Sequence, residues 1–147
     1  ESFATPGNMP EKIRRFCRET NQPVPETEGE VIRTAAESLA LKCAHAVFGL
    51  EEVFGKSIDV IHMVGGGIKD TMVCQFIANA SGKRVVAGPV EATGTGNAIV
   101  QMMALGKIPN LASARKVVQN ATPTKEYLPQ DASLWQQAYQ RFTSYLD

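Results

Sequence analysis

The apolar positions in the middle of the chain switch between two kinds of spacing. Residues 58–64 form a short apolar run that ends in glycine, and residues 84–87 form a second run. The first run predicts a fully buried parallel strand, and the second a shorter strand. Helical spacing follows each of them, over residues 70–80 and over residues 90–105, and each helical stretch ends near a glycine. This alternation predicts an α/β fold with right-handed crossovers.

The longest predicted helix covers residues 30–54. The segment from Thr27 to Glu30 has the S/T-x-x-E spacing of a capping box, and Gly55 marks the other end of the helix. Apolar residues recur along one face and predict a buried stripe. This predicted stripe consists of Val31, Ala35, Leu39, Ala46, Leu50 and Val53.

Shorter helices are predicted on both sides of this region. The first 29 residues are punctuated by prolines and contain a predicted helix over residues 9–20. Nearer the other end, Asn110 is predicted to cap a helix over residues 111–119, and Asp131 to cap the last helix.

We predict a single unit over residues 1–147, with an entry segment (1–29), an α/β core (30–106) and C-terminal helices (107–147). Two strands alone make a poor sheet, because parallel strands need cover on both faces and partners on both edges. We therefore expect the native sheet to take further strands from upstream sequence or from another subunit. The isolated chain is expected to self-associate or to be marginally stable. The absence of an initial methionine also favours a fragment or a processed product.

The charge balance argues against nucleic acid as a partner. Among 147 residues, 15 Lys and Arg stand against 15 Asp and Glu, and no dense basic cluster breaks this balance. Three widely separated cysteines, Cys17, Cys43 and Cys74, match no zinc motif and predict buried reduced thiols in a cytoplasmic protein. The sequence has no signal-peptide pattern and no apolar run long enough to span a bilayer, so we expect no membrane partner.

Candidate chemistry lies in the glycine turn after the first strand. Gly65, Gly66 and Gly67 let the backbone approach a ligand closely, and a helix start offers unpaired N–H groups, an arrangement suited to a nucleotide. Residues 87–98 repeat the theme. The dinucleotide fingerprint fits poorly, because Asp70 stands where its third glycine is needed, and no Walker A loop is present. A tight turn without any ligand remains an alternative for both segments.

Five stretches, in this order, give the chain a specific resemblance to a known family. They are residues 6–10, 23–25, 37–42, 61–67 and 86–93. Over about residues 3–128 the chain resembles the C-terminal part of rhamnulokinases, which are carbohydrate kinases of the FGGY family. The resemblance implies part of a ribonuclease-H-like ATPase domain of the actin, hexokinase and Hsp70 superfamily. It also implies a longer enzyme that transfers phosphate from ATP, with Mg²⁺, to the 1-hydroxyl of the ketose L-rhamnulose.

The resemblance also implies an adenosine-binding role for the glycine turn. Carried over to this chain, Gly65, Gly66 and Gly67 would lie under the ribose and α-phosphate, with Ile68 starting the next helix. Asp70 stands where relatives usually have an asparagine that contacts adenine; an ionised Asp cannot donate a hydrogen bond as Asn can. The family's phosphate loops, metal-orienting acid, catalytic aspartate and sugar pocket lie upstream, so no catalytic residue and no metal ligand is assigned here.

Other titratable residues are predicted to have structural roles. His62 is predicted to be a hydrogen-bonded core histidine, and Glu51 and Glu52 to lie at a solvated helix end. His45, on the long helix, has no Ser or Cys spaced as a catalytic partner. Two alternatives to a kinase fragment stay open: a nucleotide-binding regulatory protein of the same superfamily, and a structural module with empty turns.

Overall fold

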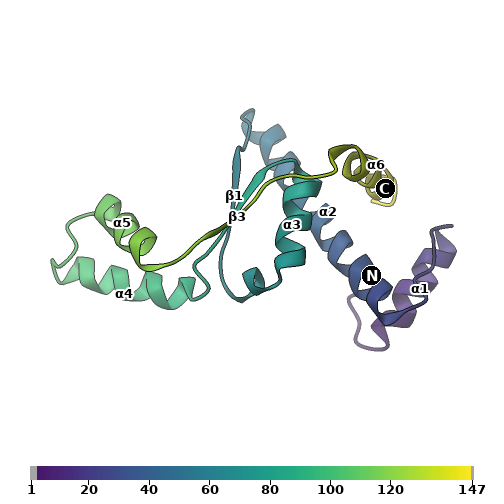
Figure 1. The fold of residues 1–147 in the computed structure, drawn as a ribbon, viewed down its shortest axis with the longest axis horizontal. Coiled ribbons are helices and arrows are strands. Elements are labelled where there is room, and N and C mark those ends of the chain that lie inside the picture. The colour runs from purple at the N-terminus through teal and green to yellow at the C-terminus, as the bar shows by residue number, and fades with distance from the viewer. Residues whose placement is uncertain (1–2, 147) are drawn as a thin grey trace.

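The computed structural model describes residues 3–146, which form a central sheet with helices extending from it in several directions (Figure 1). The strands are β1 (Val60–Met63), β2 (Arg84–Ala87) and β3 (Lys125–Tyr127). The α-helices are α1 (Met9–Glu19), α2 (Glu28–Phe54), α3 (Thr71–Ser81), α4 (Ala92–Ala104), α5 (Leu111–Ala121) and α6 (Ala132–Thr143), and a short 3-10 helix, η1, covers Gly66–Lys69. The predicted α/β class is confirmed.

The sheet has the order β1-β2-β3. The predicted parallel pairing is present between β1 and β2, where Ile61 lies opposite Val85. The prediction of only two strands was wrong, because β3 adds an antiparallel strand with Tyr127 opposite Val85. The sequence hid this strand because it has three residues, of which Lys125 and Glu126 are exposed and only Tyr127 is buried.

Helices α2 and α3 pack together over one face of the sheet and build the core. The capping box of α2 is confirmed: the Thr27 side chain accepts from the N–H of Glu30, whose carboxylate accepts from the N–H of Thr27. Gly55 ends the helix in the left-handed region, with φ of +62°. The buried core joins residues of α2, α3 and the sheet: Ala40, Leu41, Ala44, Cys74, Ile77, Ala78, Ala80, Val85, Ala87 and Tyr127.

The predicted buried stripe of α2 is mostly exposed. Of its members only Val31 is buried, whereas Leu39 is 51% exposed and Val53 is 80% exposed. Ala35, Ala46 and Leu50 are exposed as well. The helix buries a different face, with Ala36, Ala40, Leu41 and Ala44. Helical spacing alone could not choose between two faces that are both apolar.

Strand β1 is also less buried than predicted. The first two residues and Met63 are half-buried, and His62 is exposed, so it is not a core histidine. Val64, directly after the strand, is 55% exposed. The reason is the position of β1 at the edge of the sheet, where among residues 3–146 only β2 pairs with it.

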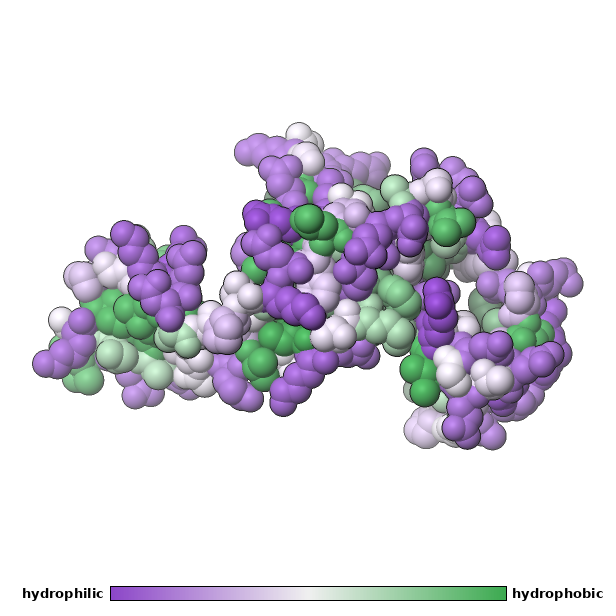
Figure 2. Space-filling view, in the orientation of Figure 1, coloured by the Kyte–Doolittle hydropathy of each residue, from purple (hydrophilic) through white to green (hydrophobic). Residues whose placement is uncertain are grey.

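Helices α4 and α5 form an arm that extends away from the sheet (Figure 1). Figure 2 shows apolar side chains gathered on the surface of this arm, where Val100 and Leu105 are 65% and 74% exposed. Asn110 caps α5 as predicted, since its side chain accepts from the N–H of Ser113.

The last helix begins differently from the prediction. Asp131 stands at the N-cap position of α6 but in the left-handed region, with φ of +52°, and its side chain makes no capping bond. Aromatic packing attaches the helix to α3, where the ring centroids of Trp135 and Phe76 lie 5.2 Å apart. In the described part of the chain, none of the helices is long and apolar enough to cross a bilayer.

Candidate functional site

Two turns that contain glycine lie side by side at one edge of the sheet. They follow β1 and β2, which are parallel, so both turns leave the carboxyl ends of neighbouring strands. Two backbone bonds join them: the N–H of Gly88 donates to the Met63 carbonyl, and the N–H of Gly65 donates to the Pro89 carbonyl, both at 2.9 Å. Ligands of open α/β sheets bind at this edge.

The first turn has a backbone that requires glycine at its start. Gly65 has φ of +85° and ψ of −172°, a region that side chains with a Cβ rarely adopt. The chain then makes one turn of 3-10 helix, in which the N–H of Ile68 donates to the Gly65 carbonyl at 3.3 Å. Ile68 therefore lies inside η1 and does not start α3, which begins at Thr71.

The outer side of the turn faces open space. A Cβ atom built on Gly65, Gly66 or Gly67 would meet no other atom within 4 Å. The opposite side is filled, because the Ile68 side chain packs partly buried against the core. The turn thus presents bare backbone outward from a fixed base, which is the shape that a ribose or phosphate needs for close approach.

Asp70 links the turn to helix α3. Its Oδ1 atom accepts from the N–H groups of Met72 and Val73, at 3.1 Å and 3.0 Å, so it is the N-cap of α3. The side chain is exposed on this edge of the sheet. A carboxylate in this position satisfies two of the donors at the helix start and interacts favourably with the helix dipole.

Cys74 supports the turn from below. The side chain is fully buried, and its Sγ atom lies 3.7 Å from the Ile68 carbonyl, to which the thiol donates. Burial raises the pKa of this thiol, and the nearby charge of Asp70 raises it further. Cys17 is buried as well, whereas Cys43 is half-buried, and burial raises the pKa of both of these thiols. All three cysteines are free, and the prediction that they are buried holds for Cys17 and Cys74 but not for Cys43.

The second turn is hydrogen-bonded to the first and is itself closely packed. Gly88 has φ of +136°, and a Cβ atom there would lie 3.0 Å from the Pro123 carbonyl oxygen and 3.2 Å from Cγ2 of Thr124. The bonds between the turns, and this close approach of residues 123–124, could not be read from the sequence. The only signal was the recurrence of glycine after each predicted strand.

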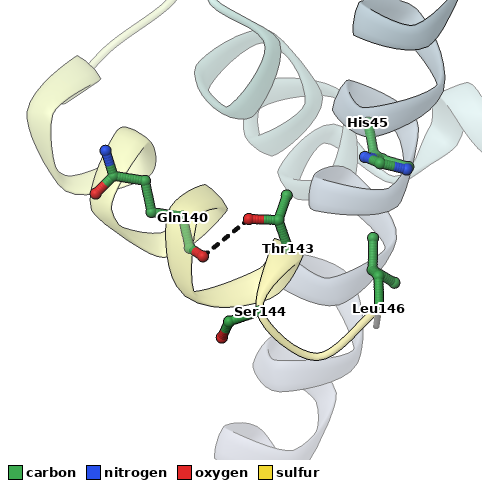
Figure 3. A pocket seen from close by; sticks show the side chains of 5 residues that line it. All are labelled: His45, Gln140, Thr143, Ser144 and Leu146. Carbon is green, nitrogen blue, oxygen red and sulfur yellow. Dashed lines mark hydrogen bonds between the residues drawn. The ribbon is translucent and has the colours of Figure 1, made fainter.

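A hollow of the surface lies elsewhere, between α2 and the end of α6 (Figure 3). His45 from α2 and Gln140, Thr143, Ser144 and Leu146 from the C-terminal segment line it, and no residue of the glycine turn does.

Three of the side chains that line it already have hydrogen-bond partners. The Nδ1 atom of His45 lies 3.0 Å from the Tyr139 hydroxyl, while the hydroxyls of Thr143 and Ser144 donate to the carbonyls of Gln140 and Arg141. The bond between His45 and Tyr139 attaches α6 to α2, whereas the other two lie within the C-terminal segment. None of the three joins a nucleophile to a base of a catalytic pair.

The prediction that Glu51 lies at a solvated helix end is wrong in one respect, because its carboxylate is held by two hydrogen bonds. Its carboxylate accepts from the Lys83 ammonium at 2.7 Å and from the N–H of Ile58 at 2.6 Å, with about a fifth of its side chain exposed (20%). The hydrogen bond from Lys83, followed by the one from Ile58, lowers the pKa of Glu51. Glu51 thus fixes the end of α2 to the start of β2, and its role is structural.

The described residues contain no cluster of three or more His, Cys, Asp or Glu side chains that could hold a metal ion. The glycine turn, in contrast, leaves open space over Gly65 to Gly67, where side chains would otherwise lie.

Comparison with known proteins adds the family context. Residues 1–105 match the model of the FGGY family of carbohydrate kinases, C-terminal domain. The chain is 41% identical over 142 residues to a rhamnulokinase from Bacteroides thetaiotaomicron. The aligned stretch covers 97% of this chain and 29% of that protein. It is 40% identical over 129 residues to a rhamnulokinase from Bacillus subtilis, covering 88% of this chain and 27% of that protein. The chain therefore spans less than a third of the length of these relatives.

Proposed function

Because this chain belongs to the FGGY family of carbohydrate kinases, we propose that it is the adenosine-binding part of a longer kinase that phosphorylates L-rhamnulose with ATP. The observation that carries the proposal is the open glycine turn at the carboxyl edge of the β1–β2 pair, fixed by two backbone bonds. The similarity to rhamnulokinases over most of the chain supports the choice of sugar.

In this proposal, the backbone of Gly65 to Gly67 lies against the ribose and α-phosphate of ATP. The bound ATP supplies the γ-phosphoryl group, and Mg²⁺ bound with it would neutralise charge on the phosphates. Gly65 supplies the turn geometry, Ile68 anchors the turn in the core, and Cys74 supports it from below. Their task is to hold the nucleotide in one place, which is most of what phosphoryl transfer asks of a protein.

In this chain Asp70 caps helix α3 and does not act as a donor to adenine. One of its oxygens is already engaged by two N–H groups of α3. A carboxylate can only accept hydrogen bonds, so it could receive one from the amino group of adenine but could not donate to a ring nitrogen.

The chain itself is proposed to be inactive, because the groups for the sugar, the metal and the attacking hydroxyl are assigned to sequence outside it. We also assign it to the cytoplasm, in keeping with its three free thiols.

The decisive experiment measures ADP release by the complete gene product with ATP, Mg²⁺ and a panel of ketoses, beside the 147-residue chain. We expect release that depends on sugar, is strongest with L-rhamnulose, and comes from the longer protein alone. Release with another ketose would keep the kinase and change its substrate. ATP binding without any sugar-dependent release would favour a regulatory protein, and absence of ATP binding would favour a structural module.

The position of the nucleotide is tested with Gly66→Val. Gly66 lies outside the left-handed region, and a Cβ there meets nothing within 4 Å, so the variant should fold. The branched side chain would occupy the proposed ribose space and weaken ATP binding by about tenfold or more, or at least ~1.4 kcal/mol. Gly29→Val, an equally open site on the first turn of α2, is the matched control. Equal ATP affinities of the two variants in calorimetry, with equal melting temperatures, would refute this position.

A further inference from the structure

Helix α2 presents an uncovered apolar face along its whole length. We call this face the outer stripe and define it by six residues: Ile32, Ala35, Leu39, Ala46, Leu50 and Val53. Ile32 is 61% exposed and Leu50 is 48% exposed, and the other four members are exposed too. Four of the six, at positions 32, 39, 46 and 53, are seven residues apart, so the stripe runs nearly straight along the helix for about 32 Å.

The outer stripe lies opposite the face that packs on α3. Ala40, Leu41 and Ala44 belong to the buried core, and His45 and Phe48 contact α6 through aromatic packing. A helix with apolar residues on two opposite faces is normally buried on both of them. Removing apolar side chains such as Leu, Ile and Val from water is favourable, so covering the stripe would stabilise the molecule substantially.

The sheet gives a second, independent sign of missing cover. Strand β1 pairs with β2 on one side, and within residues 3–146 no strand pairs with its other side. Within this strand, the side chain of Ile61 packs against the core, and the side chain of His62 is exposed. A strand edge of this kind is a template for another strand.

The occupant must therefore supply both an apolar surface and a strand. A second copy in a two-fold dimer would have to offer, within one self-complementary patch, both an apolar surface for the stripe and a strand for the edge of β1. More than two thirds of the length of the relatives lies outside the stretch that aligns with this chain, which is ample for both tasks. We infer that the outer stripe of α2 is an internal interface, on which the remainder of a rhamnulokinase-like polypeptide packs. This inference rests on the proposed function.

The test is reassembly of two fragments. The 147-residue chain is co-expressed with a tagged Bacteroides thetaiotaomicron rhamnulokinase that lacks the aligned stretch, and the complex is isolated and titrated. We expect the unaltered chain to co-purify. Leu39→Glu and Val53→Glu, which place a charge in the stripe, should each weaken the association at least tenfold. Ser38→Glu adds the same charge at an exposed neighbour outside the stripe and should associate like the unaltered chain.

Each outcome bears on the proposal. Because both substituted side chains are exposed, the melting curves of the free variants should match that of the free chain, which separates loss of the interface from loss of fold. Failure of the unaltered chain to associate, or equal association of all variants, would overturn the inference. Sedimentation that shows a dimer of the chain, abolished by Leu39→Glu, would replace it with self-pairing. ATP affinity of the unaltered chain is measured separately, so the proposed function can fail while the interface stands.

Discussion

The molecule contains the same strand–glycine turn–helix unit twice, and the two copies differ sharply in how they are held. In the first unit, β1 leads through Gly65–Asp70 into α3, whose residues from Ile77 to Ser81 are all buried. In the second unit, β2 leads through Gly88–Glu91, which contains a single glycine, into α4, which has no buried residue. Asp70 caps α3 with two hydrogen bonds, whereas Glu91, at the same place before α4, makes no capping bond with its side chain.

The difference means that the two turns are not equally well fixed in position. A turn can hold a ligand in place only when its own position is fixed, and packing of the following helix fixes it. The first unit has that support, together with the bond from Gly65 to the Pro89 carbonyl. The second unit provides that carbonyl and so braces the first. Under the proposed function, the nucleotide therefore belongs to the first turn, and the second turn has a bracing role.

The largest expected effect is the difference between the stability losses caused by one substitution in α3 and one in α4. Ile77 in α3 is 3% exposed and belongs to the core, whereas Val100 in α4 is 65% exposed. Ile77→Ala should lower the free energy of unfolding by about 2–5 kcal/mol, because it removes buried methyl groups and leaves a cavity. Val100→Ala should change it by less than about 0.5 kcal/mol. Urea unfolding followed by circular dichroism measures both values.

A large loss for Val100→Ala would show that the arm of α4 and α5 is packed in solution, and the contrast between the two units would disappear. Equal small losses would mean that α3 is not the support of the turn.

Local signals in the sequence predicted the elements well, and the partners of those elements poorly. The Thr27–Glu30 capping box and the Asn110 cap depend on neighbours within three residues, and both are present. Strand β3 was missed, because its place depends on pairing with β2, about forty residues away. The buried face of α2 was chosen wrongly, since both faces are apolar and only tertiary packing decides between them.

The candidate site divides in the same way. Glycines after a strand indicated the turn at residues 65–67, and Asp70 was singled out within it. What the sequence could not provide was the second turn beside the first, joined through Met63 and Pro89. Nor could it provide the cap that Asp70 forms on α3, because the same carboxylate could equally have pointed at a ligand.

A smaller effect separates the glycines of the second unit from each other. Gly88→Ala should destabilise the protein by about 1–3 kcal/mol, because φ there is +136° and the added Cβ would lie 3.0 Å from the Pro123 carbonyl oxygen. Gly96→Ala, within α4, has no atom within 4 Å of the new Cβ and should stabilise the helix by about 0.5–1 kcal/mol.

Thermal melting of both variants gives the sign of each change. If Gly88→Ala melted at the temperature of the unaltered chain, the close packing of the second turn against residues 123–124 would be wrong, and its bracing role with it.

The smallest expected effect concerns the two helix starts, and it separates capping from ligand contact. Asp70→Ala should cost about 0.5–2 kcal/mol of stability, since two N–H groups of α3 lose their acceptor. Glu91→Ala should cost close to nothing, because the Glu91 side chain makes no capping bond. Asp70→Asn is the informative third variant, because Asn caps a helix about as well as Asp but is uncharged and can also donate. If Asp70 acts on the nucleotide as well as on α3, Asp70→Asn will keep the melting temperature and change the affinity for ATP. If its role ends at the helix start, both quantities will stay where they were, and the first turn will hold the nucleotide through its backbone alone.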